Sequence, residues 1–260
     1  MKKLFVVGLI LWTAPVWAGF TVADFERMAA RDLIPEIRLA AGYALVNHYA
    51  ATKSESELIA LAKAGVSEAV RLAASLALSQ KWLDAGKTRD ELLKLAAEEA
   101  SAEVRAAAVP ALMTAIITDK ADALLELAKT GATEELQYAA AKAYFQKTRA
   151  TFNREKLEAI CLDESLPVGY RKAAAEFLAG HYLFPEKTAL SKAELEKQAL
   201  EHTNKYMRYA AAVALVNYLV EESADALYKK VVALFLAPGV SEEYRWAYAR
   251  ALGLKWAAGL

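Results

Sequence analysis

The sequence predicts an all-α protein, a solenoid of about seven two-helix repeats spanning residues 19–260. One short pattern built around an arginine recurs along the chain, the apolar residues around it keep to one helical face, and a shorter amphipathic segment precedes each copy. Periods between about 20 and 50 residues are typical of solenoids, because one helix pair cannot bury its apolar face without a neighbour. We therefore expect a single domain, elongated by the stacking of its repeats.

The recurring pattern is clearest when the chain is aligned on one residue per copy. The aligned residues lie 32 to 37 positions apart and are Arg38, Arg71, Arg105, Gln137, Arg171, Arg208 and Arg245. The residue before each is apolar, and alanines follow two and three positions later in nearly every copy, as Ala107 and Ala108 do after Arg105. These offsets fall on one face of a helix, where small side chains let a neighbouring helix approach closely.

Polar and flexible residues mark where the predicted helices begin and end. Ser67, Ser101, Thr133 and Ser241 stand where N-caps belong, each with a glutamate following in the first turn. Glycines close the preceding helices, at Gly65, Gly86, Gly131 and Gly239. Pro110 falls inside its predicted helix, where we expect a local kink.

The motif x-V-R-x-A-A-A-x-A-L, clearest at residues 70–78 and 104–112, resembles the second-helix signature of HEAT repeats, especially the short repeats related to phycobilisome lyases. The resemblance covers nearly all of residues 19–260 and implies a right-handed α-α superhelix. In that family the arginine usually bonds acidic or backbone groups between repeats, and the resemblance implies this structural role for Arg38, Arg71, Arg105, Arg171, Arg208 and Arg245. Gln137 departs from the family pattern, so the row should be interrupted in the fourth repeat.

The first eighteen residues have the pattern of a bacterial signal peptide. Lys2 and Lys3 precede an apolar stretch over residues 4–17, and Val16 and Ala18 are the small residues of a cleavage site. The apolar stretch is shorter than a membrane-spanning helix needs and contains Pro15. We expect cleavage after Ala18, a periplasmic or secreted mature chain, and no insertion of that mature chain in the membrane.

Charge and cysteine content exclude several kinds of protein. The chain has 32 basic and 32 acidic residues, which is not the basic composition of a nucleic-acid binder. Cys161 is the sole cysteine, so an internal disulfide cannot form, and its apolar neighbours predict a buried thiol.

Residues suited to catalysis or metal binding do not converge in the sequence. The three histidines are His48, His181 and His202, and the first two are four repeats apart, too far to share a metal ion. Residues 84–88, DAGKT, lack the first glycine of a phosphate-binding loop and follow a predicted helix instead of a strand. We therefore expect no catalytic residues, no metal, no cofactor and no enzymatic activity.

Aromatic side chains recur immediately after the aligned residue in later repeats, at Tyr138, Tyr209 and Trp246. This position faces away from the alanines, towards the concave surface of a solenoid, and Tyr43, Phe145 and Arg250 lie on nearby faces. Aromatic rings with a polar edge are typical of protein- and peptide-binding grooves. Two alternatives stay open: the rings fill space between repeats, or they stack on a glycan.

These observations favour an exported, non-enzymatic scaffold that binds a protein or peptide on its concave face, at Tyr138, Tyr209 and Trp246. One alternative is a cofactor- or substrate-handling protein of the lyase-like HEAT type. Its mark would be a polar cluster on the concave face of neighbouring repeats, which we do not find in the sequence. The other alternative is a purely structural spacer.

Overall fold

The computed structural model describes residues 20–184 and 189–259, so the predicted signal peptide lies outside the described residues. Within these ranges the chain forms 14 α-helices and one short 3-10 helix, with no strand. The prediction of an all-α protein is confirmed.

The helices alternate between two layers along the chain. The outer layer consists of α2 (Val22–Arg31), α4 (Glu55–Ala64), α6 (Arg89–Glu98), α8 (Ala121–Thr130), α10 (Arg154–Leu162), α12 (Lys192–Glu201) and α14 (Ala224–Leu236). The inner layer consists of α3 (Pro35–Thr52), α5 (Glu68–Ala85), α7 (Ala102–Ile116), α9 (Glu134–Lys147), α11 (Val168–Leu183), α13 (Lys205–Leu219) and α15 (Glu242–Ala257). The 3-10 helix, Arg149–Thr151, follows α9.

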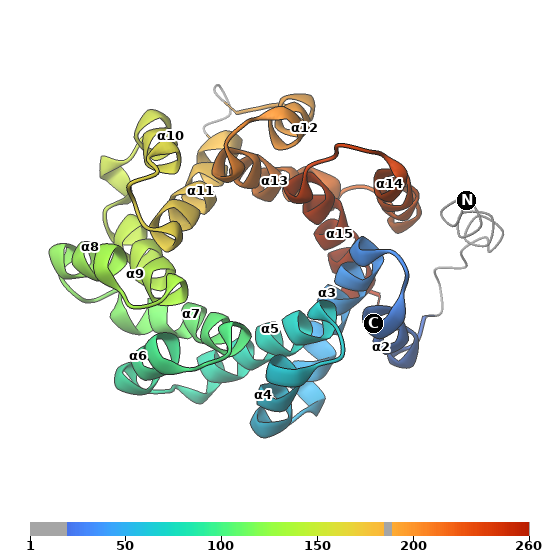
Figure 1. The fold of residues 1–260 in the computed structure, drawn as a ribbon, viewed down its shortest axis with the longest axis horizontal. Coiled ribbons are helices and arrows are strands. Elements are labelled where there is room, and N and C mark those ends of the chain that lie inside the picture. The colour runs from blue at the N-terminus through green and yellow to red at the C-terminus, as the bar shows by residue number, and fades with distance from the viewer. Residues whose placement is uncertain (1–19, 185–188, 260) are drawn as a thin grey trace.

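The inner helices form a closed ring (Figure 1), because the last of them, α15, packs directly against the first, α3. Each inner helix also packs against its predecessor and its successor, and each outer helix covers the inner helix that follows it. The expectation of an elongated array is therefore wrong. The repeated sequence pattern determines which residues of neighbouring helix pairs are in contact. It does not determine the rotation from one pair to the next, and this rotation decides whether the array closes.

Helix ends agree with the capping residues in the sequence. Ser67, Ser101, Thr133 and Ser241 are confirmed as N-caps whose hydroxyl oxygens accept a backbone N–H. Three of them also donate to the outer helix of an earlier pair: Ser67 to the carbonyl of Ala29, Thr133 to that of Ala96, and Ser241 to that of Ala199. The inner-helix caps thus fasten adjacent pairs together.

Glycines lie at or near the predicted helix ends, and Pro110 lies inside its helix as predicted. Gly65, Gly86 and Gly131 are C-caps, whereas Gly239 lies two residues beyond the C-cap of α14. Helix α7 continues through Pro110 to Ile116.

The alanine positions form the contact surface between inner helices. Ala73, Ala74, Ala107 and Ala108 are at most 1% exposed, and the equivalent alanines of the other inner helices are buried as well. Burial of such small side chains brings the helix backbones together, so the predicted close packing is confirmed.

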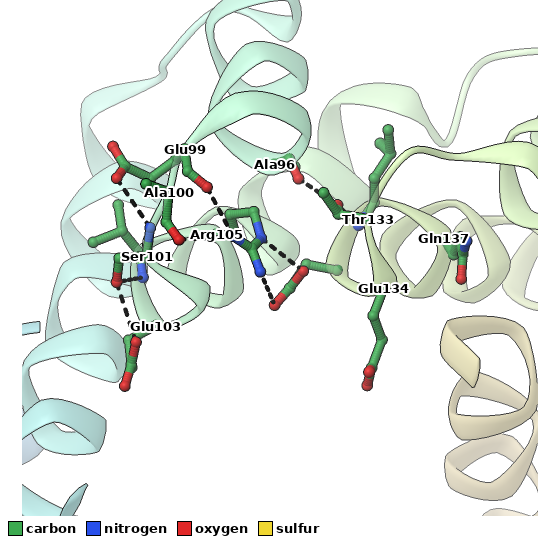
Figure 2. Close-up of polar contacts among 12 residues, drawn as sticks. Ala96, Glu99, Ala100, Ser101, Glu103, Arg105, Thr133, Glu134 and Gln137 are labelled. Atoms are coloured by element: carbon green, nitrogen blue, oxygen red, sulfur yellow. Dashed lines mark hydrogen bonds and ion pairs between the residues drawn. The ribbon is translucent and has the colours of Figure 1, made fainter. Parts of the chain in front are cut away.

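Four of the aligned arginines, Arg71, Arg105, Arg208 and Arg245, pair with a glutamate in the first turn of the next inner helix around the ring, and we call each such contact a rung. Figure 2 shows the rung at Arg105. Arg105 donates from Nε and Nη2 to the two carboxylate oxygens of Glu135, at 2.9 and 3.3 Å, and from Nη1 to the carbonyls of Glu99 and Ala100. Arg208 bonds Glu243 in the same way, and Arg71 donates to Glu103 from Nε alone and to the carbonyl of Gly65 from Nη1. Each of these arginines therefore caps the carbonyl groups at the end of the outer helix before it and also binds a glutamate of the next inner helix. That glutamate stands two residues before the aligned residue of its own helix.

The rungs change where the next helix lacks that glutamate. Gln137 bonds only the carbonyl of Gly131, and the position opposite it is Gly169, where α9 and α11 approach so closely that a Cβ would lie 2.3 Å from the carbonyl oxygen of Glu134. Arg171 faces the ring of Tyr206, 4.6 Å from its centroid. Gln137 and Gly169 are thus two sides of one unusually close contact.

The ring closes through the same kind of contact, between α15 and α3. Arg245 pairs with Glu36, which stands two residues before Arg38, and Trp246 donates from Nε1 to the hydroxyl of Tyr43 at 3.1 Å. A Cβ at Gly253 would lie 2.5 Å from the carbonyl oxygen of Ala40, so the two backbones touch here. We call this α3–α15 contact the seam.

The rung at the seam is looser than the others. Nη1 of Arg245 lies 3.5 Å from Oε1 of Glu36, and neither Nε of Arg245 nor Oε2 of Glu36 has a hydrogen-bond partner among the described residues. At Arg105, by contrast, Nε and Nη2 form two hydrogen bonds to the glutamate, at 2.9 and 3.3 Å. Close backbone packing, more than this ion pair, therefore holds the seam.

None of the described helices combines the length and the apolar character that crossing a bilayer requires.

Replacing Gly253 with alanine should weaken the seam, because its methyl group would overlap backbone atoms of Ala40 that cannot move independently. We expect a loss of about 1–3 kcal/mol in the free energy of unfolding, measured with urea. Gly180→Ala is the matched control, since Gly180 is in a helix with nothing within 4 Å of its Cβ position, and it should stabilise by about 0.4–1 kcal/mol. Equal stability of the two variants would contradict the packing of the seam.

Candidate functional site

Side chains at two positions of the inner helices, the first and the fifth after the aligned residue, contact one another from α3, α9, α11, α13 and α15. The first position carries Tyr138, Tyr209 and Trp246, the three residues predicted as a protein-binding surface. The fifth carries Tyr43, Lys142, Glu176 and Arg250 in four of the seven helices. We call these seven residues the interior cluster.

Glu176 on α11 is the centre of one half of the cluster. It accepts a hydrogen bond from Lys142 Nζ at 2.9 Å and another from the hydroxyl of Tyr209 at 2.8 Å. Lys142 also lies over the ring of Tyr138, with Nζ 5.2 Å from the centroid. Three consecutive inner helices, α9, α11 and α13, are therefore connected by one carboxylate.

Trp246 on α15 is the centre of the other half. Its indole donates to Tyr43 across the seam, its ring lies 5.6 Å from that of Tyr209, and the guanidinium of Arg250 stands 5.0 Å from its centroid. Arg250 is also 5.9 Å from the ring centroid of Tyr43. The Tyr209–Trp246 contact joins the two halves.

Arg250 acts across the ring, and this places its charge in the interior. Burial raises the pKa of Tyr43, Tyr138 and Tyr209, and the positive field of Arg250 opposes the rise at each hydroxyl. Tyr138 is on α9, which is separated from α15 by α11 and α13 along the ring (Figure 1). The arginine of the last helix therefore faces hydroxyls from several others.

Glu176 stays ionised at neutral pH. Burial alone would raise the pKa of its carboxyl group, but the charge of Lys142 and hydrogen bonds from Tyr138, Lys142 and Tyr209 bring the pKa below its usual value. The charges of Lys142 and Glu176 then cancel, and Arg250 leaves the interior cluster with one positive charge.

Two hollows open at the N-terminal ends of the inner helices, which the arginine rungs hold on one face of the ring. The seam hollow, of about 630 Å³, is lined by Glu36, Leu39, Glu68, Glu242 and Trp246 among others. The lysine hollow, of about 240 Å³, is lined by Glu134, Lys172, Lys205, Tyr206 and Tyr209 among others. Two of the predicted binding residues thus line these hollows, Trp246 the seam hollow and Tyr209 the lysine hollow.

A third hollow, of about 400 Å³, lies on the outer helix α6 and is lined mainly by charged side chains of that helix. It is remote from the interior cluster.

Two other residues singled out in the sequence belong to the core. Phe145 is fully buried and packs against Phe152, Tyr170 and Phe177, so it does not face the interior with Tyr43 and Arg250. Cys161 is also fully buried, as predicted, and burial raises the pKa of its thiol to about 12. Residues 84–88 form the turn from α5 to α6, with Thr88 as N-cap.

The three histidines are distributed over the ring. His48 lies against Tyr49, His181 lies against Phe177, and Nδ1 of His202 accepts the backbone N–H of Asn204. Within the described ranges, no three histidine, cysteine or acidic side chains gather closely enough to coordinate a metal ion.

The sequence analysis missed Lys142 and Glu176. Both stand five residues after an aligned residue, where Leu76, Pro110 and Val213 occupy the neighbouring helices. The signal in the sequence was a pair of opposite charges at this position in consecutive repeats, where three other repeats have an apolar residue. Their contact makes a polar cluster on neighbouring inner helices, the feature expected of a ligand-handling protein and not recognised in the sequence.

No protein-family model matches the sequence, and no significant match was found among curated proteins or solved structures.

Glu176→Gln should destabilise the fold by about 1.5–3 kcal/mol at neutral pH, because Lys142 and Tyr209 lose a charged acceptor. Glu126→Gln is the control: this exposed glutamate of α8 has no side-chain partner among the described contacts, and its replacement should change stability by less than about 0.5 kcal/mol. Urea unfolding of both variants measures the difference.

The same experiment has a pH dependence of defined sign. Because the pKa of Glu176 in the folded protein is below the usual glutamate value of 4.5, its stabilising effect is complete above about pH 4.5 and is lost as pH falls through the folded pKa. The stability gap between wild type and Glu176→Gln should therefore narrow in acid. A gap that widens as pH falls would contradict the ionised state of Glu176.

Proposed function

We propose that this chain is an exported, non-enzymatic scaffold of about seven HEAT-like repeats, and that it binds a protein or peptide on the inner surface of its ring. Supporting the repeat assignment are the alternating outer and inner helices and the arginine rungs between first turns. Export to the periplasm or beyond rests on the pattern of residues 1–18.

The observation that carries the binding proposal is the position of Trp246 and Tyr209. Each lines a hollow at the N-terminal face of the ring, and their rings lie 5.6 Å apart, so the two hollows share one aromatic wall. Large aromatic rings at the centre of a concave surface are the groups that contribute most at peptide interfaces. Lys172 and Lys205 on one side, with Glu68 and Glu242 on the other, supply a polar rim.

A second candidate function is ligand handling of the lyase-like HEAT type. The polar cluster of Lys142, Glu176 and Tyr209 on successive inner helices favours it. The purely structural spacer has no comparable support, because a spacer does not need charged groups turned into its interior.

Affinity capture from an envelope extract of the source cell tests the scaffold proposal. We expect one protein to be enriched on the purified chain and to be lost when Tyr138, Tyr209 and Trp246 are all replaced with alanine. The three aromatic side chains also pack against other inner helices, so their loss can affect folding. The milder double variant Lys172→Ala, Lys205→Ala changes only the polar rim and should reduce capture by about tenfold.

The control is Lys94→Ala, Lys129→Ala, which removes the same number of lysines from the outer helices α6 and α8. It should capture the partner as the wild type does, and circular dichroism should show that all variants are folded. Equal capture by the rim variant and its control, or no enrichment by the wild type, would remove the basis for the scaffold.

A further inference from the structure

The unusual feature of Arg250 is that it lacks an ion-pair partner within residues 20–184 and 189–259. No carboxylate among the described residues lies within ion-pair distance of its guanidinium, and its recorded contacts are the ring faces of Trp246 and Tyr43. The other charged residues of the interior cluster are paired, because Lys142 forms an ion pair with Glu176. Glu176 is on α11, two inner helices before α15, which carries Arg250. A guanidinium has five N–H donors, and aromatic faces satisfy none of them with a hydrogen bond to oxygen.

Tyr43 supplies a further unused donor beside Arg250. Its hydroxyl oxygen accepts the indole N–H of Trp246, and its own proton has no acceptor among the described residues. The tyrosine and arginine come from α3 and α15, so the two donors meet only because the ring is closed. Both side chains are partly exposed, so a ligand can reach them.

We propose that Arg250 and Tyr43 bind a carboxylate in the interior of the ring, beside the wall formed by Trp246 and Tyr209. A carboxylate fits both donors, since its two oxygens accept a guanidinium N–H and a hydroxyl proton together. It also matches the charge. The seven residues of the interior cluster have one surplus positive charge, and outside the cluster the carboxylate of Glu68 also acts on the Tyr43 hydroxyl. A phosphate dianion would add a second negative charge near Glu68 and Glu176, which the single charge of Arg250 does not compensate.

The source of the carboxylate that we propose is the C-terminus of a peptide, and this part rests on the proposed function. The seam hollow, of about 630 Å³, holds Trp246 in its wall, and Arg250 follows one turn later on the same helix. Arg250 and Tyr43 are not in the lining of this hollow, and Trp246, which contacts Arg250, joins the two. In the proposed complex the chain end extends past Trp246 to place its terminal carboxylate at Arg250, and its last side chains lie against Leu39 and Trp246. An internal segment of a peptide would have to enter as a loop.

Calorimetric titration of the full chain, purified after export, tests the site. The probes are N-acetyl-Ala-Leu with a free C-terminus, the same dipeptide as its C-terminal amide, and sodium acetate. We expect the free acid to bind at least about tenfold more tightly than the amide, because the amide lacks the charge that Arg250 recognises. Arg250→Met should abolish this preference, and Tyr43→Phe should reduce it severalfold.

Arg149→Met is the control, since Arg149 is an exposed arginine of the 3-10 helix, and it should keep the full preference. Arg250→Lys retains the charge and should keep part of the preference, which separates recognition from misfolding. Equal binding of acid and amide, or a preference that survives Arg250→Met, would overturn the site.

The acetate titration tests whether the site recognises a peptide terminus or any small carboxylate. Weaker binding of acetate than of the dipeptide acid supports a peptide terminus, because the side chains then contribute. Acetate binding as tightly as the dipeptide, and lost in Arg250→Met, would overturn the peptide terminus. Failure to capture a protein from the extract would contradict the scaffold proposal alone. Binding of the dipeptide and acetate is measured without a partner protein, so it tests the carboxylate site separately.

Discussion

Close approach between neighbouring inner helices is the constraint on which the rest of the structure depends. Alanines at two faces of each inner helix bring backbones together, and glycines take their place where the approach is closest, at Gly169 and Gly253. The arginine rungs then fix the first turns in register. Because the last helix meets the first by the same packing, the rule that stacks two pairs also closes the ring.

Closure of the ring brings residues of distant repeats together on the inner surface. In an open array, Tyr43 and Tyr209 would lie far apart along a groove, since four repeats separate them along the chain. In the ring these residues share one interior, where Glu176 joins α9, α11 and α13, and Arg250 of α15 acts on hydroxyls from α3, α9 and α13. The proposed carboxylate site exists only at the seam, so binding and closure are coupled.

Much of this architecture could be predicted from the sequence, because helical periodicity and capping are local. The N-caps at Ser67, Ser101, Thr133 and Ser241, and the buried alanines, follow directly from residue types at fixed offsets. Closure could not be predicted, since it depends on small rotations summed over every pair. Its traces in the sequence, Glu36 before Arg38 and Gly253 late in α15, have meaning only once their partners are known.

A nuclear Overhauser effect between the indole N–H of Trp246 and the ring protons of Tyr43 measures closure most directly. These residues are 203 positions apart in the chain and 3.1 Å apart at their polar atoms. A closed ring predicts a strong cross-peak, lost in Trp246→Phe while the rest of the spectrum is preserved. A well-dispersed spectrum of the folded protein without this cross-peak would contradict the closed ring.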